Sequence, residues 1–169
     1  MYALPYEYYE KYGIRRYGFH GTSHHYVSSR AADLLGQPFE DVRIITCHLG
    51  NGCSIDAVNG GRAVDTSMGF TPQEGLMMGT RAGDVDATGP LCIMREGGLS
   101  MQEIDAVMNK KSGLLGVSGI SSDMREVEAA ARAGNDRAAL AIDIYCYRIR
   151  KYIAAYAGVL SGCDALVFT

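Results

Sequence analysis

The order of apolar and polar positions along the chain predicts helices separated by short strands. Apolar residues at helical spacing, with capping residues beside them, predict helices over 5–12, from Thr22 or Ser23 to about Leu35, over 90–96, 101–108 and 124–133, and from Asn135 to about Leu160. Apolar runs predict buried strands over 42–46 and 165–169. Alternation around Asn59-Gly60-Gly61 predicts a hairpin of 54–58 and 62–66, because Asn-Gly favours the type I′ turn.

One stretch, residues 68–83, fits neither the helical nor the strand period. It is rich in glycine and joins the predicted hairpin to the next predicted helix. Long connections inside a compact domain tend to be functional. The chain has 21 glycines, clustered between positions 50 and 119, which is typical either of loops shaped for close ligand approach or of many turns.

The composition is that of an ordinary globular domain. A length of 169 residues suits one domain, and 47% hydrophobic and 21% charged residues are typical values. A formal charge of −3 argues against a general nucleic-acid surface, so an anion site would need a few cationic groups and backbone amides. No apolar stretch approaches the ~20 residues that span a bilayer, and the N-terminus does not have the pattern of a signal peptide. We therefore expect neither a nucleic-acid nor a membrane partner.

The cysteines indicate a reducing compartment. There are five of them, an odd number without any C-x-x-C pair, which fits reduced thiols in a cytoplasmic protein. Cys47, His48 and Cys53 are close in sequence, but their spacing matches no structural zinc site.

The segment CHLGNGCS, residues 47–54, follows the apolar run 42–46 and narrows the function most. Two glycines one residue apart, Gly50 and Gly52, leave backbone N–H groups open to an approaching phosphate. Asn51 between them tolerates left-handed dihedral angles and offers a side-chain amide. An ordinary hairpin connection would have the same sequence features, so the segment alone leaves both interpretations open.

Two charged or titratable side chains are also flanked by glycine. His20 lies between Gly18 and Gly21 just before a predicted helix, whose N-terminus favours an anion; a hydrogen-bonded structural histidine is the alternative. Arg81 in GTRAGD can present a planar cationic fork to a phosphate or carboxylate, or can be a surface arginine in a loop. The nearby His24 and His25 are interpreted as residues of the helix surface or core.

Imidazoles, an arginine and a backbone anion nest are the groups that phosphoryl transfer uses, because its catalysis is mostly positioning and charge neutralisation. The chain has no Walker motif and no kinase glycine-rich loop with its strand lysine. Another nucleotide-binding architecture would have to supply the chemistry.

Three segments, RRYGFHGTSH, HLGNGCS and DTSMGFTPQEGLMMGTRAGD, closely resemble signature segments of acetate kinases, members of the acetate and sugar kinase, Hsp70 and actin superfamily. The resemblance extends over essentially the whole chain and includes SGISSDMRE. It implies an α/β fold of the ribonuclease-H-like, actin-like ATPase class, with a mixed central sheet flanked by helices. Propionate kinases share nearly all of these segments, so the resemblance leaves the substrate open between acetate and propionate.

The resemblance also implies roles for individual residues. His20 and Arg81 match the histidine and arginine that stabilise the transferring phosphoryl group. Contacts to the phosphates of ATP are implied for His48, Leu49, Gly50, Asn51 and Gly52, and contacts to the nucleoside for Asp123, Met124 and Arg125. The implied reaction is reversible transfer of the γ-phosphoryl group of ATP to acetate, giving acetyl phosphate and ADP, with Mg²⁺ as cofactor.

Family members are much longer at both ends, and the match covers most of their second, nucleotide-binding domain. We therefore expect an incomplete domain over 1–169, without the first domain, the C-terminal segment, or the residues for acetate and the metal that the family has there. The family's active site lies in a cleft between two domains, and its second domain forms a homodimer contact. The helix from Asn135 is thus either an interface element or a buried helix. The chain alone is expected to be nearly inactive, or only a nucleotide-binding module. Ala87-Thr88-Gly89-Pro90 departs from the family pattern, as a loop variation.

Overall fold

The structure is a computed structural model that describes all residues, 1–169. Its contacts divide the chain into two compact units, each described by itself below. Unit 1 comprises Met1–Gly50, Ser54–Gly75 and Tyr152–Thr169. Unit 2 comprises Asn51–Cys53 and Leu76–Lys151.

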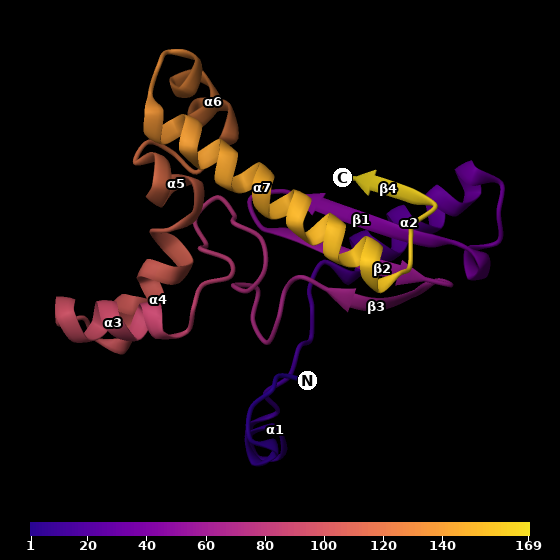
Figure 1. The fold of residues 1–169 in the computed structure, drawn as a ribbon, viewed down its shortest axis with the longest axis horizontal. Coiled ribbons are helices and arrows are strands. Elements are labelled where there is room, and N and C mark those ends of the chain that lie inside the picture. Colours follow the sequence, from indigo (N-terminus) through magenta and orange to yellow (C-terminus); the bar gives the residue numbers. More distant parts are fainter. The chain divides into compact units, whose positions relative to one another are not determined.

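A four-stranded mixed sheet, in the order β3-β2-β1-β4, is the centre of unit 1 (Figure 1). Its strands are β1 (Arg43–Leu49), β2 (Cys53–Asn59), β3 (Arg62–Thr66) and β4 (Ala165–Phe168). Strands β2 and β3 form the predicted hairpin, antiparallel, with an irregularity between Ala57 and Val58. Strand β4 pairs in parallel with β1, from Ile44 opposite Ala165 to Cys47 opposite Phe168. The prediction of the hairpin is confirmed.

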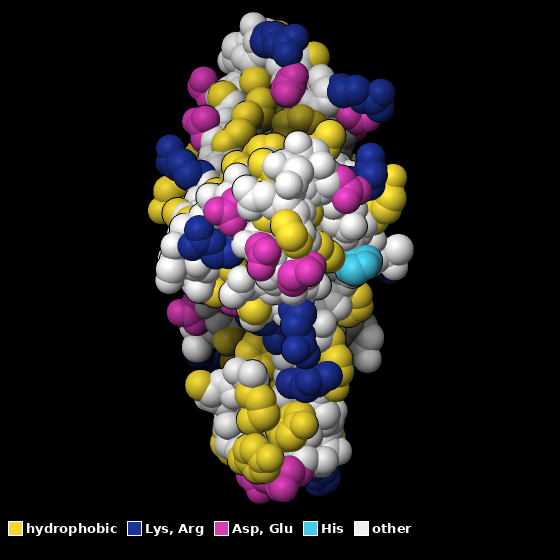
Figure 2. All heavy atoms as spheres, turned by 90° about the vertical axis from the view of Figure 1, so that its right-hand side faces the viewer, with side chains coloured by type: hydrophobic (Ala, Val, Ile, Leu, Met, Phe, Trp, Pro, Cys, Tyr) yellow, Lys and Arg dark blue, Asp and Glu magenta, His cyan; other side chains and the backbone are white.

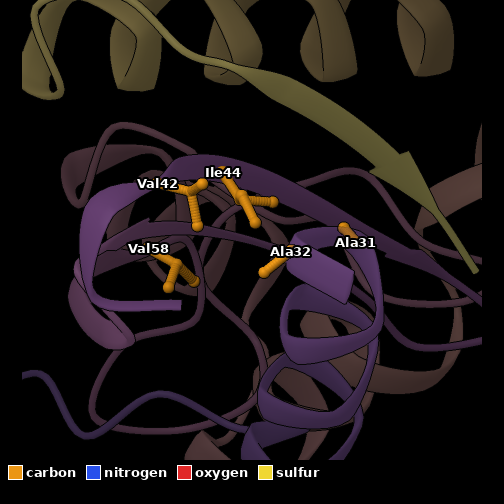
Figure 3. Close-up of a cluster of buried hydrophobic side chains, with 5 residues drawn as sticks. All are labelled: Ala31, Ala32, Val42, Ile44 and Val58. Carbon is orange, nitrogen blue, oxygen red and sulfur yellow. The ribbon is translucent and has the colours of Figure 1, made fainter. Parts of the chain in front are cut away.

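Helix α2 (Gly21–Leu35) packs on β1 and β4 of this sheet. Figure 3 shows the apolar cluster that joins helix and sheet, with side chains from α2, β1, β2 and the residue just before β1: Ala31, Ala32, Val42, Ile44 and Val58. All five are buried, and Val42 and Ile44 are fully so. Burial of this apolar surface holds α2 against the sheet and so fixes the position of the helix N-terminus. The remaining elements of unit 1 are α1 (Tyr6–Tyr12), a short 3₁₀ turn, η1 (Phe39–Asp41), and the last part of the helix α7 (Asp136–Val159), from Tyr152 on.

Unit 2 is helical. Its elements are α3 (Thr88–Gly97), α4 (Met101–Lys110), α5 (Gly113–Ser118), α6 (Met124–Arg132) and the first part of α7 (Asp136–Val159). A buried apolar cluster joins them: Met77, Leu114, Val127, Ala138 and Ala141. Ser100 and Glu103 form the predicted capping box of α4, with each side chain accepting a hydrogen bond from the backbone N–H of the other residue.

Helix α7 is the predicted long helix, for which the sequence left two interpretations: a buried helix of the chain or an element of a homodimer interface. Ala138 and Ala141 on α7 belong to the core of unit 2, so part of the helix is buried within the chain itself. Leu140 and Tyr147, on another side of α7, are exposed. The buried-helix interpretation therefore accounts for one face of α7, and the exposed face leaves the interface role as a prediction.

Two strand predictions are corrected by the pairing of β1 with β4. Strand β1 does not end at Thr46 but continues to Leu49, because Thr169 extends the ladder: its N–H donates to the carbonyl of Cys47, and the Leu49 N–H donates to its carbonyl, both at 2.9 Å. The last strand, β4, is not buried as predicted. It is an edge strand on which half-buried and exposed residues alternate, with Phe168 58% exposed.

The helix predictions are corrected at three places. Helix α2 begins at Gly21 rather than after a Thr22 or Ser23 cap, since its N-cap is His20 and the first helical bond runs from the His24 N–H to the His20 carbonyl. Helix α3 begins at Thr88, two residues before Pro90, which therefore lies in the first turn, where no N–H is needed. Helix α5 was not predicted, because its six residues are too few for an apolar period to be visible. The segment 68–83 contains neither helix nor strand, as predicted.

None of the helices combines the length and the apolar content that crossing a bilayer requires. On the face drawn in Figure 2, Lys and Arg side chains are interspersed with Asp and Glu side chains.

Candidate functional site

His20 is held in an unusual backbone conformation at the start of α2. Its φ of 62° and ψ of 20° place it in the left-handed region, where only one other non-glycine residue of the chain lies. Residues held in this region cost free energy and tend to occur at functional sites. Of the two nearby glycines, only Gly18 is required by the backbone: its φ is 75°, and a Cβ there would collide with the Thr66 side chain, whereas a Cβ on Gly21 would meet nothing within 4 Å.

The rings of His20 and His48 are stacked, with centroids 4.1 Å apart and planes 24° apart. His48 is near the end of β1, and its Nδ1 is 2.9 Å from the hydroxyl oxygen of Ser23 on the first turn of α2. The two histidines that the sequence predicts as site residues, His20 and His48, are thus brought together within unit 1. A stack of this kind limits the orientations that the His20 ring can adopt.

A third imidazole, that of His24, lies beneath the first turn of α2. It is 2% exposed, and its Nδ1 is 2.7 Å from the hydroxyl oxygen of Thr46 on β1. Its Nε2 is 2.6 Å from the hydroxyl oxygen of Ser54 on β2. The same Ser54 oxygen is 2.9 Å from Nδ1 of His20. Ser54 therefore joins the buried imidazole to the one that the sequence proposes for catalysis.

Asp56 completes this polar layer. It follows Ser54 by two positions on β2, so both side chains point to the same face of the sheet. A carboxylate oxygen of Asp56 is 3.4 Å from Nε2 of His24 and accepts a hydrogen bond from the Thr66 hydroxyl at 2.5 Å. Burial raises the pKa of Asp56 to about 6, although the Thr66 hydrogen bond opposes this. Burial, and next the nearby imidazoles of His20 and His48, lower the pKa of His24 to about 4. At neutral pH the pair is thus a carboxylate beside a neutral imidazole.

His24, Ser54 and Asp56 are residues that the sequence reasoning missed. The prediction left His24 as helix surface or core, and the structure shows it in the core with both ring nitrogens hydrogen-bonded. The sequences of the predicted strands contained a feature that could have indicated these residues. Thr46, Ser54 and Asp56 are polar residues on buried strands, and buried polar groups need partners.

Arg16, two residues before Gly18, was also missed as an individual residue. Its Nη1 donates to the carbonyl oxygens of Thr66 at 2.9 Å and of Ser67 and Met68 at 3.2 Å. Its Nη2 donates to Glu74 at 2.6 Å. One guanidinium thus fixes the end of β3 and the beginning of the glycine-rich segment.

In unit 2, three predicted segments meet at Gly79. The Gly79 N–H donates to the carbonyl of Asn51 at 3.1 Å. A Cβ at position 79 would collide with the side-chain oxygen of Asn51 and come within 3.2 Å of the Ser122 carbonyl oxygen. Gly79 precedes Arg81 by two residues, and Ser122 directly precedes Asp123. The lack of a side chain at Gly79 leaves room for the Asn51 side chain and the Ser122 carbonyl, so the turn at Asn51 lies against the segments of Arg81 and Asp123.

The backbone just before Arg81 is hydrogen-bonded to the start of α5, and the Ala82 N–H just after it donates to the carbonyl of Met108 on α4 at 3.0 Å. The N–H groups of Ser112, Leu114 and Leu115 donate to the carbonyls of Thr80, Met78 and Gly79, at 3.0, 2.9 and 3.0 Å. The Arg81 carbonyl accepts from the Met78 N–H at 3.1 Å, and Nη1 of Arg81 is 3.5 Å from the sulfur of Met78. The loop that carries Arg81 is therefore ordered although it has no helix or strand.

The predicted nucleoside segment forms the start of α6. The Asp123 side chain is the N-cap and accepts from the Arg125 N–H at 2.9 Å. Its carboxylate also pairs with the Arg125 guanidinium, and these hydrogen bonds lower the pKa of Asp123 to about 2. Met124 packs against the apolar core of unit 2. Asp123 and Met124 thus have local structural roles, and Arg125 is exposed.

The site residues predicted from the sequence fall in both units. His20, His48, Leu49 and Gly50 belong to unit 1, whereas Asn51, Gly52, Arg81, Asp123, Met124 and Arg125 belong to unit 2. No group of three or more His, Cys, Asp or Glu side chains is arranged to hold a metal ion. The thiol of Cys47 is buried, which raises its pKa to about 12 and makes it a poor metal ligand.

A mixed sheet covered by helices, with a turn between its two central strands, gives the chain an α/β fold of the actin-like ATPase class. The sequence model of the acetokinase family matches residues 1–169, and the chain belongs to this family. The acetate kinase of Dictyoglomus thermophilum is 60% identical over 169 residues, which are all of this chain and 42% of that relative.

Solved structures agree with this assignment. A crystal structure of Porphyromonas gingivalis acetate kinase matches with a TM-score of 0.96 and 56% identity, over 98% of this chain and 42% of that one. A propionate kinase from Francisella tularensis matches with a TM-score of 0.92 and 49% identity, over 98% and 42% of the respective chains. The chain therefore spans about two fifths of the length of these relatives. The predicted family and fold class are confirmed.

Proposed function

We propose that the chain is the nucleotide-binding part of an acetate kinase, which transfers the γ-phosphoryl group of ATP reversibly to acetate and yields acetyl phosphate and ADP. The observation that carries the proposal is the state of His20. Its ring is stacked on His48, its Nδ1 is bonded to Ser54, and its backbone is held in the left-handed region at a helix N-terminus. Such constraint on one imidazole, in a chain of the acetokinase family, is what positioning of a phosphoryl group would require.

The roles follow from the charges that phosphoryl transfer develops. Negative charge spreads over the equatorial oxygens of the transferring group, and donors aimed at them stabilise the transition state. We assign this task to the imidazole of His20 and to the guanidinium of Arg81. The turn of Gly50, Asn51 and Gly52, with His48 and Leu49 before it, would contact the phosphates of ATP.

Asp123, Met124 and Arg125 would contact the nucleoside. The cap and ion pair that Asp123 forms with Arg125 hold this segment at the start of α6, and the Met124 side chain anchors it to the core. Backbone groups and the exposed Arg125 side chain are thus the parts of the segment that remain for a ligand.

The proposal includes Mg²⁺ and acetate as cofactor and substrate, but assigns no residue of this chain to bind them. Mg²⁺ commonly binds through substrate phosphates and one or two carboxylates, and it would neutralise phosphate charge here. We assign its protein ligands and the acetate-binding groups to residues beyond this segment, as the family resemblance implies. The 169-residue chain alone would then be nearly inactive, and a homodimer would be formed by the complete enzyme.

Propionate is the second candidate acceptor, because a propionate kinase matches this chain at 49% identity. Both acceptors present the same carboxylate to the phosphoryl group. One methylene changes discrimination by only about 1–3 kcal/mol, so the same catalytic residues serve either acid.

The proposal is tested with a chimaera in which residues 1–169 replace the matching segment of the Porphyromonas gingivalis acetate kinase. We expect the chimaera to form acetyl phosphate from ATP and acetate, and the isolated chain to form almost none under the same conditions. A parallel assay with propionate measures the preference between the two acids. A folded chimaera without kinase activity would overturn the proposed function, whereas rapid turnover by the isolated chain would overturn only its expected inactivity.

A further inference from the structure

The hydroxyl group of Ser54 lies between two imidazoles and has one proton to give. Its oxygen is 2.9 Å from Nδ1 of His20 and 2.6 Å from Nε2 of His24. Since a hydroxyl donates once and accepts elsewhere, it can donate to one of these nitrogens while it accepts from the other. The protonation of His24 Nε2 and of His20 Nδ1 is therefore linked through Ser54.

Two arrangements of the protons are possible, and the negative charge of Asp56 favours one of them. In the first, His24 carries its proton on Nε2 and directs it to Ser54, near the Asp56 carboxylate oxygen at 3.4 Å. In the second, His24 carries its proton on Nδ1, and the lone pair of Nε2 faces the carboxylate. A carboxylate accepts hydrogen bonds only, so the first arrangement is favoured.

The remaining partners fit the first arrangement. With the His24 proton on Nε2, its Nδ1 accepts from the Thr46 hydroxyl at 2.7 Å. Asp56 is 5% exposed and receives the Thr66 hydroxyl proton at 2.5 Å, which fixes the carboxylate in place. Every hydroxyl in the layer then donates once, and no two acceptors face each other.

We propose that His24, Ser54 and Asp56 form a positioning relay that fixes the tautomer of His20, so that His20 accepts from Ser54 at Nδ1 and carries its proton on Nε2. None of the three relay residues touches substrate. The proposal rests on the proposed function in one respect: Nε2–H of His20 is the donor that would meet an oxygen of the transferring phosphoryl group. In the opposite tautomer, Nε2 would present a lone pair to a negatively charged oxygen, and the contact would be repulsive.

The relay explains two features of the structure that the catalytic role of His20 does not explain by itself. It gives a reason for the buried polar layer of Thr46, Ser54 and Asp56 beneath α2, where an apolar layer would otherwise be more favourable. It also gives a reason for a neutral imidazole at position 24, because a neutral ring with one proton can transmit a choice of tautomer and a doubly protonated ring cannot.

The test is the imidazole nitrogen spectrum of the chain labelled with ¹⁵N-histidine, recorded by long-range ¹H–¹⁵N correlation near pH 7.5. The chain has four histidines, and the exposed His25 on α2 is the internal reference for an imidazole outside the relay. We expect both His20 and His24 to carry their protons on Nε2. In Ser54→Ala, the nitrogen shifts of His20 should move toward those of His25.

Two further variants complete the design. Ser28→Ala is the matched control, since Ser28 is a fully buried hydroxyl one turn from His24 whose proton goes to helix carbonyls rather than to an imidazole. It should leave the His20 shifts unchanged. Asp56→Asn removes the charge that selects the tautomer and should raise the Nδ1–H population of His24 and His20 together. It keeps the proposal testable if Ser54→Ala does not fold.

A His20 that carries its proton on Nδ1 in the parent chain would overturn the relay. So would His20 shifts that are the same in the parent, Ser54→Ala and Asp56→Asn. This readout needs no substrate and no turnover. A relay seen by NMR with an inactive chimaera would therefore reject the proposed function alone, and an active chimaera with the wrong tautomer would reject the relay alone.

Discussion

Nε2 of His24 lies 3.4 Å from a carboxylate oxygen of Asp56, and both side chains are almost fully buried between α2 and the sheet. Their pKa values are displaced in opposite directions from the ordinary values, to about 4 for the histidine and to about 6 for the aspartate. Each displacement favours the neutral form of its group. The two residues therefore oppose each other in the pH dependence of stability over the same acidic range.

The sign for each residue follows from proton linkage. Asp56 binds its proton more tightly in the folded chain, so its contribution to stability is present below its ordinary pKa of 3.8 and is lost as pH rises to about 6. His24 binds its proton less tightly in the folded chain. Its contribution is therefore lost as pH falls from 6.5 to about 4.

We expect Asp56→Asn to gain stability relative to the parent as pH rises from about 4 to about 6. The gain should be about 3 kcal/mol, because each pKa unit corresponds to about 1.4 kcal/mol. Urea unfolding at a series of pH values measures it as the difference between variant and parent. Asp33→Asn, at an exposed carboxylate on α2, is the control, and equal pH slopes for the two variants would disprove the role given to Asp56.

Arg16→Lys should destabilise the chain by about 1–2 kcal/mol. The guanidinium donates to three carbonyl oxygens and to Glu74, and a lysine ammonium cannot reproduce this fork. The neighbouring Arg15→Lys is the matched control, because Arg15 is exposed and lies over the ring of Tyr17. The urea midpoint of each variant measures the effect, and a loss in Arg15→Lys as large as in Arg16→Lys would contradict it.

Gly79→Ala should weaken nucleotide binding. The new methyl group would collide with the side-chain oxygen of Asn51 and displace the turn that is proposed to contact the phosphates. In the chimaera we expect the KM for ATP to rise by about tenfold or more, which corresponds to about 1.4 kcal/mol.

Gly89→Ala is the control for that variant. Gly89 is in the first turn of α3 and has nothing within 4 Å of its Cβ position, so the change should leave the KM for ATP unaltered. If both glycine variants bind ATP like the parent, the close approach at Gly79 has no part in nucleotide binding.

Local signals in the sequence accounted for much of the fold. The hairpin turn and the Ser100–Glu103 capping box depend on neighbouring residues, and both are present in the structure, although the two turn residues are Gly60 and Gly61 rather than the predicted Asn59-Gly60 pair. The end of β1, by contrast, depended on a distant partner. The true end of β1 at Leu49 is set by pairing with Thr169, and no local pattern in 42–49 contains that information.

The site was predicted in part for the same reason. His20 and Arg81 were visible through the glycines beside them, and two of these glycines have a structural reason: Gly18 has a φ of 75°, and Gly79 leaves room for the Asn51 side chain. His24 is inconspicuous in sequence, because its importance comes from strands that lie 22 and 30 residues away. Only the packing of α2 on the sheet brings it to Thr46 and Ser54.

The central claim is that His20 and Arg81 stabilise the transferring phosphoryl group, and the kcat and KM of the chimaera test it most directly. We expect His20→Ala and Arg81→Ala each to lower kcat by about 10²–10³ while the KM for ATP changes much less, since both groups act on transition-state charge. Arg30→Ala, at an exposed arginine paired with Asp33 on α2, should leave both constants unchanged. A kcat in either His20→Ala or Arg81→Ala equal to that of the parent would contradict the claim and remove that residue from the mechanism.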